Sequence, residues 1–195
     1  MSDQVWLLRH GDTEWTEREL HTGARDVGLS EAGRDQARRA GTVLAGKRFS
    51  FVLVSPQRRA IETCRLAGFG DGAEVAEALV EWDYGDYEGL TDEQTRARDP
   101  DWDLFRDGAP RGESPGQVRA RVDRQLEELA KRQGEGLIVG HGKLLRALAA
   151  RWIGAPIELG ARLPLDPAAI SLLEREDAAG PLLRLWNYSD AIRPR

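Results

Sequence analysis

The chain has 195 residues, 41% of them hydrophobic, so it can bury one sizeable core and we expect a single domain spanning residues 1–195. Its 28 Lys and Arg against 33 Asp and Glu leave a net charge of −5, which excludes a strong general attraction to nucleic acid or acidic membranes. A single cysteine, Cys64, excludes an internal disulfide framework, and no apolar run is long enough to span a bilayer, so we expect a cytoplasmic protein.

Short apolar and β-branched runs predict the strands. The first run ends abruptly at Arg9-His10-Gly11, and its continuity is typical of a parallel strand buried on both faces. The last two strands are joined through Gly180-Pro181 in a hairpin-like return. The predicted strands span residues 5–8, 49–54, 137–139, 170–173 and 182–186.

Helix-capping signals predict helices between these strands. Ser55 is expected at the N-cap and Pro56 at the first helical position, which places Gln57, Arg58 and Arg59 in the first turn. The predicted helices span residues 30–45, begin at Ser55 and at the capping boxes 91–94 and 114–117, and span 144–153. This alternation of strands and helices indicates an α/β sandwich.

The least regular stretch, residues 99–113, is rich in Asp, Gly and Pro, with Trp102 and Phe105 embedded in it. We expect it to form a lid or a rim.

Two of the three histidines share one pattern. His10 and His141 each follow an apolar strand and precede a glycine. Ligands of open α/β sheets bind beyond the carboxyl ends of the strands, so both side chains are expected to face one crevice.

The surrounding residues favour phosphoryl chemistry. Arg9 adjoins His10, and Arg59 lies in a first helical turn, where the amides and the helix dipole also favour anions. Guanidinium groups bind phosphate oxygens in pairs and stay protonated. A neutral His10 is thus a candidate nucleophile, with Glu81 as the candidate acid.

Other site classes fit less well. Residues 41–47 have Walker spacing, but Arg48 replaces the required Ser or Thr. No His-x-x-x-His pair supports a metal site, and no Gly-x-Ser-x-Gly supports a serine nucleophile. A catalytically silent phosphate-binding protein stays open as an alternative of a different class.

The segment Leu8-Arg9-His10-Gly11 resembles the Arg-His-Gly signature of the histidine phosphatase superfamily, also called phosphoglycerate-mutase-like. Further motifs in the family's order cover almost the whole chain; they are residues 22–23, 29–33, 55–60, 81–89, 112–114 and 140–142. The resemblance implies a three-layer α/β/α sandwich with a mostly parallel central sheet.

The resemblance also implies roles for the motif residues. His10 would be the nucleophile, Arg9, Arg59 and His141 the phosphate pocket, and Glu81 the proton donor and acceptor, with no metal and no organic cofactor. The implied substrate contacts are Thr16, His21, Thr22, Gly23, Tyr84 and Gly142. Thr16 and Lys143 depart from the family pattern, because many relatives carry Asn at the first position and the mutases carry Asn at the second.

The region after Glu81 most resembles a phosphatase branch that includes fungal sedoheptulose-1,7-bisphosphatase. We therefore expect a small-molecule phosphate ester as partner, a sugar phosphate or bisphosphate, with neither nucleic acid nor membrane, and with a homo-oligomer left open. A mutase needs a cluster of basic residues to hold the dephosphorylated intermediate, and residues 89–113 carry no net positive charge. We therefore favour a phosphatase and keep phosphoglycerate mutase as the alternative activity.

Overall fold

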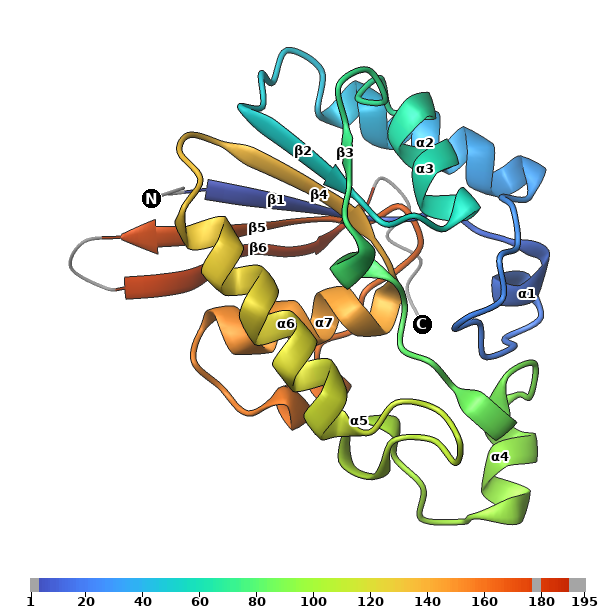
Figure 1. Ribbon diagram of the computed structural model, residues 1–195. Helices are drawn as coiled ribbons and strands as arrows, with labels where there is room; N and C mark the ends of the chain where they lie inside the picture. Colours follow the sequence, from blue (N-terminus) through green and yellow to red (C-terminus); the bar gives the residue numbers. More distant parts are fainter. Residues whose placement is uncertain (1–3, 177–179, 190–195) are drawn as a thin grey trace.

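The computed structural model describes residues 4–176 and 180–189, and a six-stranded sheet forms its centre (Figure 1). The strand order is β3-β2-β4-β1-β5-β6. β4 pairs in parallel with β1 and with β2, and β2 pairs in parallel with β3. β5 pairs antiparallel with both β1 and β6. The strands are β1 Gln4–Arg9, β2 Phe51–Val54, β3 Glu74–Val75, β4 Gly136–Gly140, β5 Ile170–Glu176 and β6 Gly180–Tyr188.

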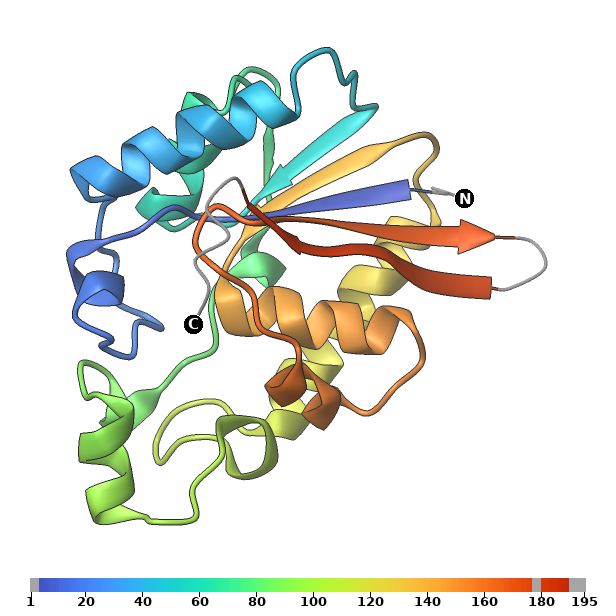
Figure 2. The ribbon, with the colours of Figure 1, turned by 180° about the vertical axis from the view of Figure 1, so that it is seen from behind.

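Helices cover both faces of this sheet, with α2 and α3 on one side and α6 and α7 on the other (Figures 1 and 2). The predicted α/β/α sandwich is confirmed. The α-helices are α1 Glu14–Glu17, α2 Glu31–Val43, α3 Arg58–Leu66, α4 Asp92–Arg98, α5 Leu104–Asp107, α6 Pro115–Ala130 and α7 Gly142–Trp152. Three short 3₁₀ helices are η1 Glu77–Leu79, η2 Gly85–Tyr87 and η3 Ile157–Arg162.

The two-residue period of the strands explains why both faces are apolar. Leu7 packs into the cluster beneath α6 and α7, and its neighbour Leu8 packs into the cluster beneath α2 and α3. Ile138 and Val139 divide between the same two clusters. Continuous apolar runs in β1 and β4 therefore reflect burial on both sides.

The predicted start of α3 and the predicted connection between the last two strands are wrong. α3 begins at Arg58 with Gln57 at its N-cap, so Ser55 and Pro56 do not cap it. Gly180 and Pro181 belong to β6, where they pair with Glu176 and Arg175, so they do not form the connection that was predicted there. Both predicted capping boxes are confirmed, at Thr91 for α4 and at Ser114 for α6.

The irregular stretch 99–113 is anchored by its aromatic residues. Phe105 is 2% exposed and packs edge-on against Trp82, while Trp102 donates its indole N–H to the Gly108 carbonyl at 2.7 Å. This segment, which includes α5, thus contributes side chains to the core.

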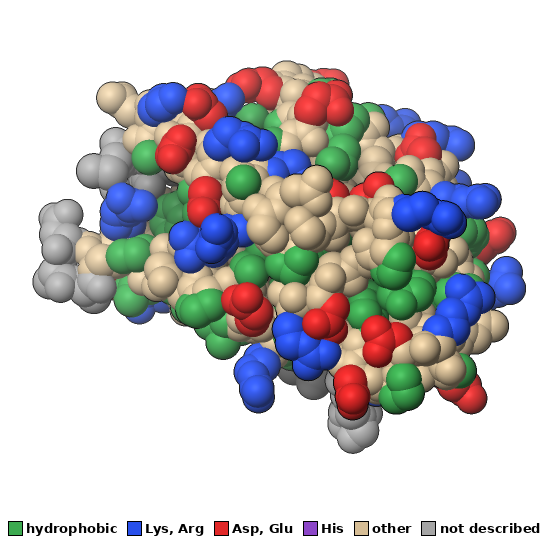
Figure 3. All heavy atoms as spheres, turned by 60° about the horizontal axis from the view of Figure 1, so that its bottom comes forward, with side chains coloured by type: hydrophobic (Ala, Val, Ile, Leu, Met, Phe, Trp, Pro, Cys, Tyr) green, Lys and Arg blue, Asp and Glu red, His purple; other side chains and the backbone are tan. Residues whose placement is uncertain are grey.

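The surface shows no large patch of one charge on the face drawn in Figure 3, where acidic and basic side chains intermingle. Within residues 4–176 and 180–189, no helix has the length and apolar character needed to cross a membrane.

Candidate active site

Strand pairing brings the two strand-end histidines together. Arg9 pairs with Gly140 in the parallel register of β1 and β4, so His10 and His141 leave the sheet side by side. The backbone N–H of His10 donates to the Gly140 carbonyl at 2.9 Å, and the two imidazole centroids lie 5.1 Å apart. The two histidines are therefore neighbours as predicted, but only His10 lines the cavity described below, so the prediction that both face it is wrong for His141.

A backbone carbonyl sets the tautomer of His10. The Nδ1 atom lies 2.7 Å from the carbonyl oxygen of Gly11, and because a carbonyl only accepts, Nδ1 carries the proton and donates it. Burial lowers the His10 pKa well below its ordinary value, and the positive charges of Arg59 and Arg9 lower it further. His10 is therefore a neutral imidazole whose Nε2 lone pair is free for chemistry.

His141 takes the opposite tautomer. Its Nδ1 accepts from the Nε of Arg59 at 3.1 Å, so its Nε2 carries the proton and donates to the Ser55 hydroxyl at 2.7 Å. Burial, followed by the charge of Arg59, lowers the His141 pKa well below its usual range. Ser55 follows β2, the strand beside β4, and its role as a histidine partner was missed because Ser-Pro resembles a helix start.

Arg59 is fully buried behind the histidines. Besides His141, its guanidinium donates to the Arg25 carbonyl at 2.8 Å, the Gly23 carbonyl at 3.1 Å and the Gln57 side-chain oxygen at 3.1 Å. Burial lowers the Arg59 pKa, and the nearby carboxylate of Glu81 opposes this effect. In this arrangement Arg59 holds loop 23–25 and the ring of His141 in fixed positions.

Glu88 orders the same loop from the other side. Its carboxylate accepts from the backbone N–H groups of Gly23, Ala24 and Arg25, at 2.9 to 3.3 Å. With the amides turned toward Glu88, the carbonyls of Gly23 and Arg25 face Arg59. A Cβ on residue 23 would lie 2.3 Å from the Trp82 carbonyl, so this close approach requires glycine.

Gln57 links the two halves of the site. Its side-chain N–H donates to the Gly23 carbonyl at 2.7 Å, while its side-chain oxygen accepts from Arg59 and from the backbone N–H of Glu81 at 3.1 Å. Sequence reasoning assigned Gln57 only to a helical turn.

Three backbone amides hold the carboxylate of Glu81. Its Oε1 accepts from Trp82 and Leu144, both at 2.9 Å, and its Oε2 accepts from Lys143 at 3.0 Å. Two of these donors belong to the first turn of α7, so a helix N-terminus holds Glu81. Oε2, with one such bond, keeps a lone pair for proton transfer.

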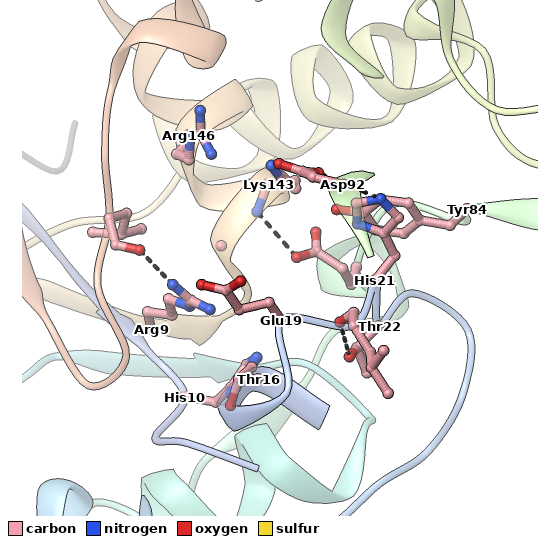
Figure 4. A pocket seen from close by; sticks show the side chains of 14 residues that line it. Arg9, His10, Thr16, Glu19, His21, Thr22, Tyr84, Asp92, Lys143 and Arg146 are labelled. Carbon is pink, nitrogen blue, oxygen red and sulfur yellow. Dashed lines mark hydrogen bonds and ion pairs between the residues drawn. The ribbon is translucent and has the colours of Figure 1, made fainter. Parts of the chain in front are cut away.

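A cavity of about 310 Å³ lies beside these groups. Among the predicted catalytic residues, Arg9, His10 and Glu81 line it, whereas Arg59 and His141 lie behind its wall and support it. The lining residues are Arg9, His10, Thr16, Glu19, Leu20, His21, Thr22, Glu81, Tyr84, Asp92, Gly142, Lys143, Arg146 and Leu165, most of which are labelled in Figure 4.

Five of the six predicted substrate contacts also line the cavity, namely Thr16, His21, Thr22, Tyr84 and Gly142. The sixth, Gly23, is not part of the lining, and its carbonyl accepts hydrogen bonds from Arg59 and Gln57. The Thr16 hydroxyl, on α1, is 3.0 Å from an Asp12 carboxylate oxygen that accepts from it. His21 stacks on Tyr84 with ring centroids 4.7 Å apart, and burial lowers its pKa to about 4. His21 thus presents a neutral ring to the cavity.

A backbone N–H that was predicted to bind phosphate instead donates to a carboxylate of the protein itself. The backbone N–H of Arg58, in the first turn of α3, donates to the Asp26 carboxylate at 2.7 Å. The expectation that exposed amides of this helix bind phosphate is therefore wrong for this amide. Sequence reasoning also passed over Lys143 and Arg146 as cations of the cavity, although both follow His141 within two turns of α7.

Comparisons with known proteins agree with this geometry. The family model described as "Histidine phosphatase superfamily (branch 1)" matches residues 5–189. An acid phosphatase of Mycobacterium tuberculosis is 41% identical over 175 residues, covering 87% of this chain and 85% of that protein. A 2,3-bisphosphoglycerate-dependent phosphoglycerate mutase of Methylorubrum extorquens is 38% identical, covering 82% and 86%. Sedoheptulose 1,7-bisphosphatase of Saccharomyces cerevisiae is 30% identical, covering 78% and 68%.

Solved structures share the whole fold. The product of an open reading frame from Mycobacterium tuberculosis aligns with a TM-score of 0.89 and 37% identity, covering 97% of this chain and 99% of that one. A mycobacterial glucosyl-3-phosphoglycerate phosphatase in complex with VO3 aligns with a TM-score of 0.83 and 31% identity, covering 96% and 100%. This chain is therefore an enzyme of branch 1 of the histidine phosphatase superfamily.

Proposed function

We propose that this enzyme hydrolyses phosphate monoesters through a phosphohistidine at His10. The observation that carries the proposal is the neutral imidazole of His10, whose Nδ1–H is held by Gly11 and whose Nε2 faces a cavity lined by Arg9. A buried nucleophile beside guanidinium groups suits attack on a dianionic phosphoryl group.

In the first step, Nε2 of His10 forms a bond to phosphorus as the ester P–O bond breaks. The leaving oxygen takes a proton from the carboxyl group of Glu81 at Oε2. In the second step, Glu81 removes a proton from water, the water oxygen bonds to phosphorus, and the N–P bond breaks. Phosphate leaves, and both His10 and protonated Glu81 are restored.

The positive field for both steps comes from side chains. Arg9 lines the cavity, and Arg59 lies against His141 behind it, so their charges offset the charge of the transferring group. We therefore propose that turnover needs no metal. Activity that is lost in a chelator and restored by a divalent ion contradicts this part of the proposal.

The proposed substrate is a sugar phosphate or sugar bisphosphate. The names of two similar proteins, sedoheptulose 1,7-bisphosphatase and glucosyl-3-phosphoglycerate phosphatase, support this class. Release of inorganic phosphate from p-nitrophenyl phosphate tests the hydrolase activity itself, and absence of turnover favours a silent phosphate-binding protein. Phosphate release from a panel of sugar phosphates and bisphosphates then tests the substrate class.

Phosphoglycerate mutase activity is the second candidate, and the 38% identity to such a mutase favours it. A mutase must retain the dephosphorylated intermediate and exclude water. Incubation with 3-phosphoglycerate, with both free phosphate and isomerised product measured, separates the two activities. We expect phosphate release to exceed isomerisation.

We also place the enzyme in the cytosol. The single cysteine, Cys64, is a free thiol on the buried side of α3, and burial raises its pKa to about 12, so it stays protonated. Fractionation of cells that produce the protein tests this location.

A further inference from the structure

Two cations of α7 face the cavity on the same side. Lys143 and Arg146 are three residues apart on the helix that begins directly after His141, and both line the cavity. Residues at this spacing lie on one helix face, where like charges repel. In the view of Figure 4 they occupy the end of the cavity away from His10.

Neutral groups hold Arg146 in place. Its Nε donates to the Gly160 carbonyl at 2.7 Å and its Nη2 to the Ala161 carbonyl at 2.9 Å, while its guanidinium lies 5.1 Å from the ring centre of Phe105. Carbonyl oxygens and an aromatic face orient the guanidinium, but they carry no net charge to neutralise it.

Neither cation forms an ion pair with a carboxylate in the part of the chain that the structure describes. Within residues 4–176 and 180–189, Lys143 and Arg146 take part in no ion pair, and the Lys143 ammonium donates no hydrogen bond. Glu19 and Asp92 also line the cavity, and the Asp92 side chain is 70% exposed, with its Oδ1 3.5 Å from Nε2 of His21. Glu81 accepts hydrogen bonds from three backbone N–H groups and from neither of these two side chains.

This arrangement is costly without an anion. Burial lowers the Lys143 pKa to about 8, Arg146 adds to that effect, and Asp92 and Glu81 oppose it. Two partly buried cations on one wall, neither in a direct ion pair among the described residues, are the arrangement expected of a site that receives negative charge from a ligand.

We propose that Lys143 and Arg146 form a second anion site, which binds an anionic group of the substrate while His10 attacks a phosphoryl group elsewhere on the same molecule. This inference rests on the proposed function and narrows it. The preferred substrate carries two anionic groups, as a sugar bisphosphate or a phosphorylated carboxylic acid does.

The experiment measures competition against hydrolysis of p-nitrophenyl phosphate. Fructose 1,6-bisphosphate carries a second phosphate, 3-phosphoglycerate carries a carboxylate, and fructose 6-phosphate has only its one phosphate. Lys143→Met removes the ammonium but keeps the backbone N–H that holds Glu81, and Lys143→Arg keeps a positive charge. Lys131→Met is the matched control, because Lys131 is exposed at the C-cap of α6 and pairs with Glu128.

For the original enzyme we expect inhibition constants about tenfold lower for one or both of the two doubly anionic compounds than for fructose 6-phosphate. Lys143→Met should remove most of that difference, whereas Lys143→Arg and Lys131→Met should keep it. Whether the bisphosphate or the phosphoglycerate gains more identifies the second group as phosphate or carboxylate.

Equal inhibition constants for all three compounds in the original enzyme overturn the proposal, and so does an equal change for all three in Lys143→Met. If p-nitrophenyl phosphate is not hydrolysed, the proposed function fails instead. Calorimetric titration of the same three compounds into the same variants then decides the second anion site separately.

Discussion

The imidazole rings of His10 and His141 lie 5.1 Å apart, yet their protons sit on different nitrogen atoms. His10 donates from Nδ1 to the Gly11 carbonyl, and His141 donates from Nε2 to Ser55. The backbone and Arg59 thus give two neighbouring histidines distinct roles, one with a free lone pair and one fixed on both sides.

Ser55→Ala removes the acceptor for the Nε2 proton of His141. The buried N–H is then unpaired, so we expect unfolding free energy to fall by about 1–3 kcal/mol and kcat/KM to fall by about tenfold as the ring loses its orientation. Denaturant unfolding and steady-state kinetics measure the two effects. Ser171→Ala is the control, because Ser171 is equally buried but bonds the Asn187 backbone in the β5–β6 region. Equal kinetic losses in both variants contradict a specific role for Ser55.

Glu88→Gln tests the loop that orients Arg59. The neutral amide weakens the hydrogen bonds to the N–H groups of residues 23–25, so the carbonyls that hold Arg59 become less ordered. We expect the inhibition constant of inorganic phosphate to rise by about tenfold, because charge-assisted bonds are roughly twice as strong as neutral ones. Glu62→Gln, which alters a carboxylate bonded to Arg34 and Leu29, should leave that constant unchanged. A loss of stability without any change in phosphate binding would falsify this positioning role.

Glu81→Gln should slow hydrolysis by an amount that depends on the leaving group. An amide cannot protonate the departing oxygen, so hydrolysis of an alkyl or sugar phosphate should slow by about 10²–10⁴-fold. Formation of the phosphoenzyme from p-nitrophenyl phosphate should slow far less, since p-nitrophenolate leaves unaided. Burst-phase kinetics on both substrates give the comparison. Equal slowing of the first step for both substrates rules out Glu81 as the acid.

Lys143→Met should stabilise the protein at neutral pH. The folded-state pKa of Lys143, about 8, lies below its ordinary value of 10.5, so between these values the unfolded chain binds more protons. The cost of the buried charge is therefore fully present below about pH 8 and shrinks as the pH rises toward 10.5. We expect the variant to gain about 1–3 kcal/mol at pH 7 and less at pH 9.5. A gain that is constant across this range shows that the charge is not its origin.

The sequence predicted the parts of this site that depend on strand ends. Arg9, His10 and His141 follow continuous apolar runs, and a parallel sheet brings such ends together whatever the intervening chain does. The contacts of Arg59 were not predictable in this way, because its acceptors in loop 23–25 depend on Glu88, which is distant in sequence.

Local sequence signals gave wrong predictions where a tertiary contact uses the same side chain. Ser55 has the residue type of a helix cap, and its hydroxyl does accept from the Gln57 backbone N–H at 3.4 Å, but its shorter bond, at 2.7 Å, is to His141, and α3 starts at Arg58. Likewise, the search for a cationic clamp in residues 89–113 overlooked Lys143 and Arg146, whose common direction depends on how α7 packs beside the cavity.

The proposed mechanism depends on a phosphohistidine at His10. It is tested most directly by mixing Glu81→Gln with p-nitrophenyl phosphate, quenching in alkali and locating the phosphoryl group by mass spectrometry. The missing base slows hydrolysis of the intermediate, so the account predicts one phosphoryl group on the peptide that contains His10, and none after the same treatment of a variant that also carries His10→Ala. A phosphoryl group on another residue, or the same labelling without His10, contradicts the account.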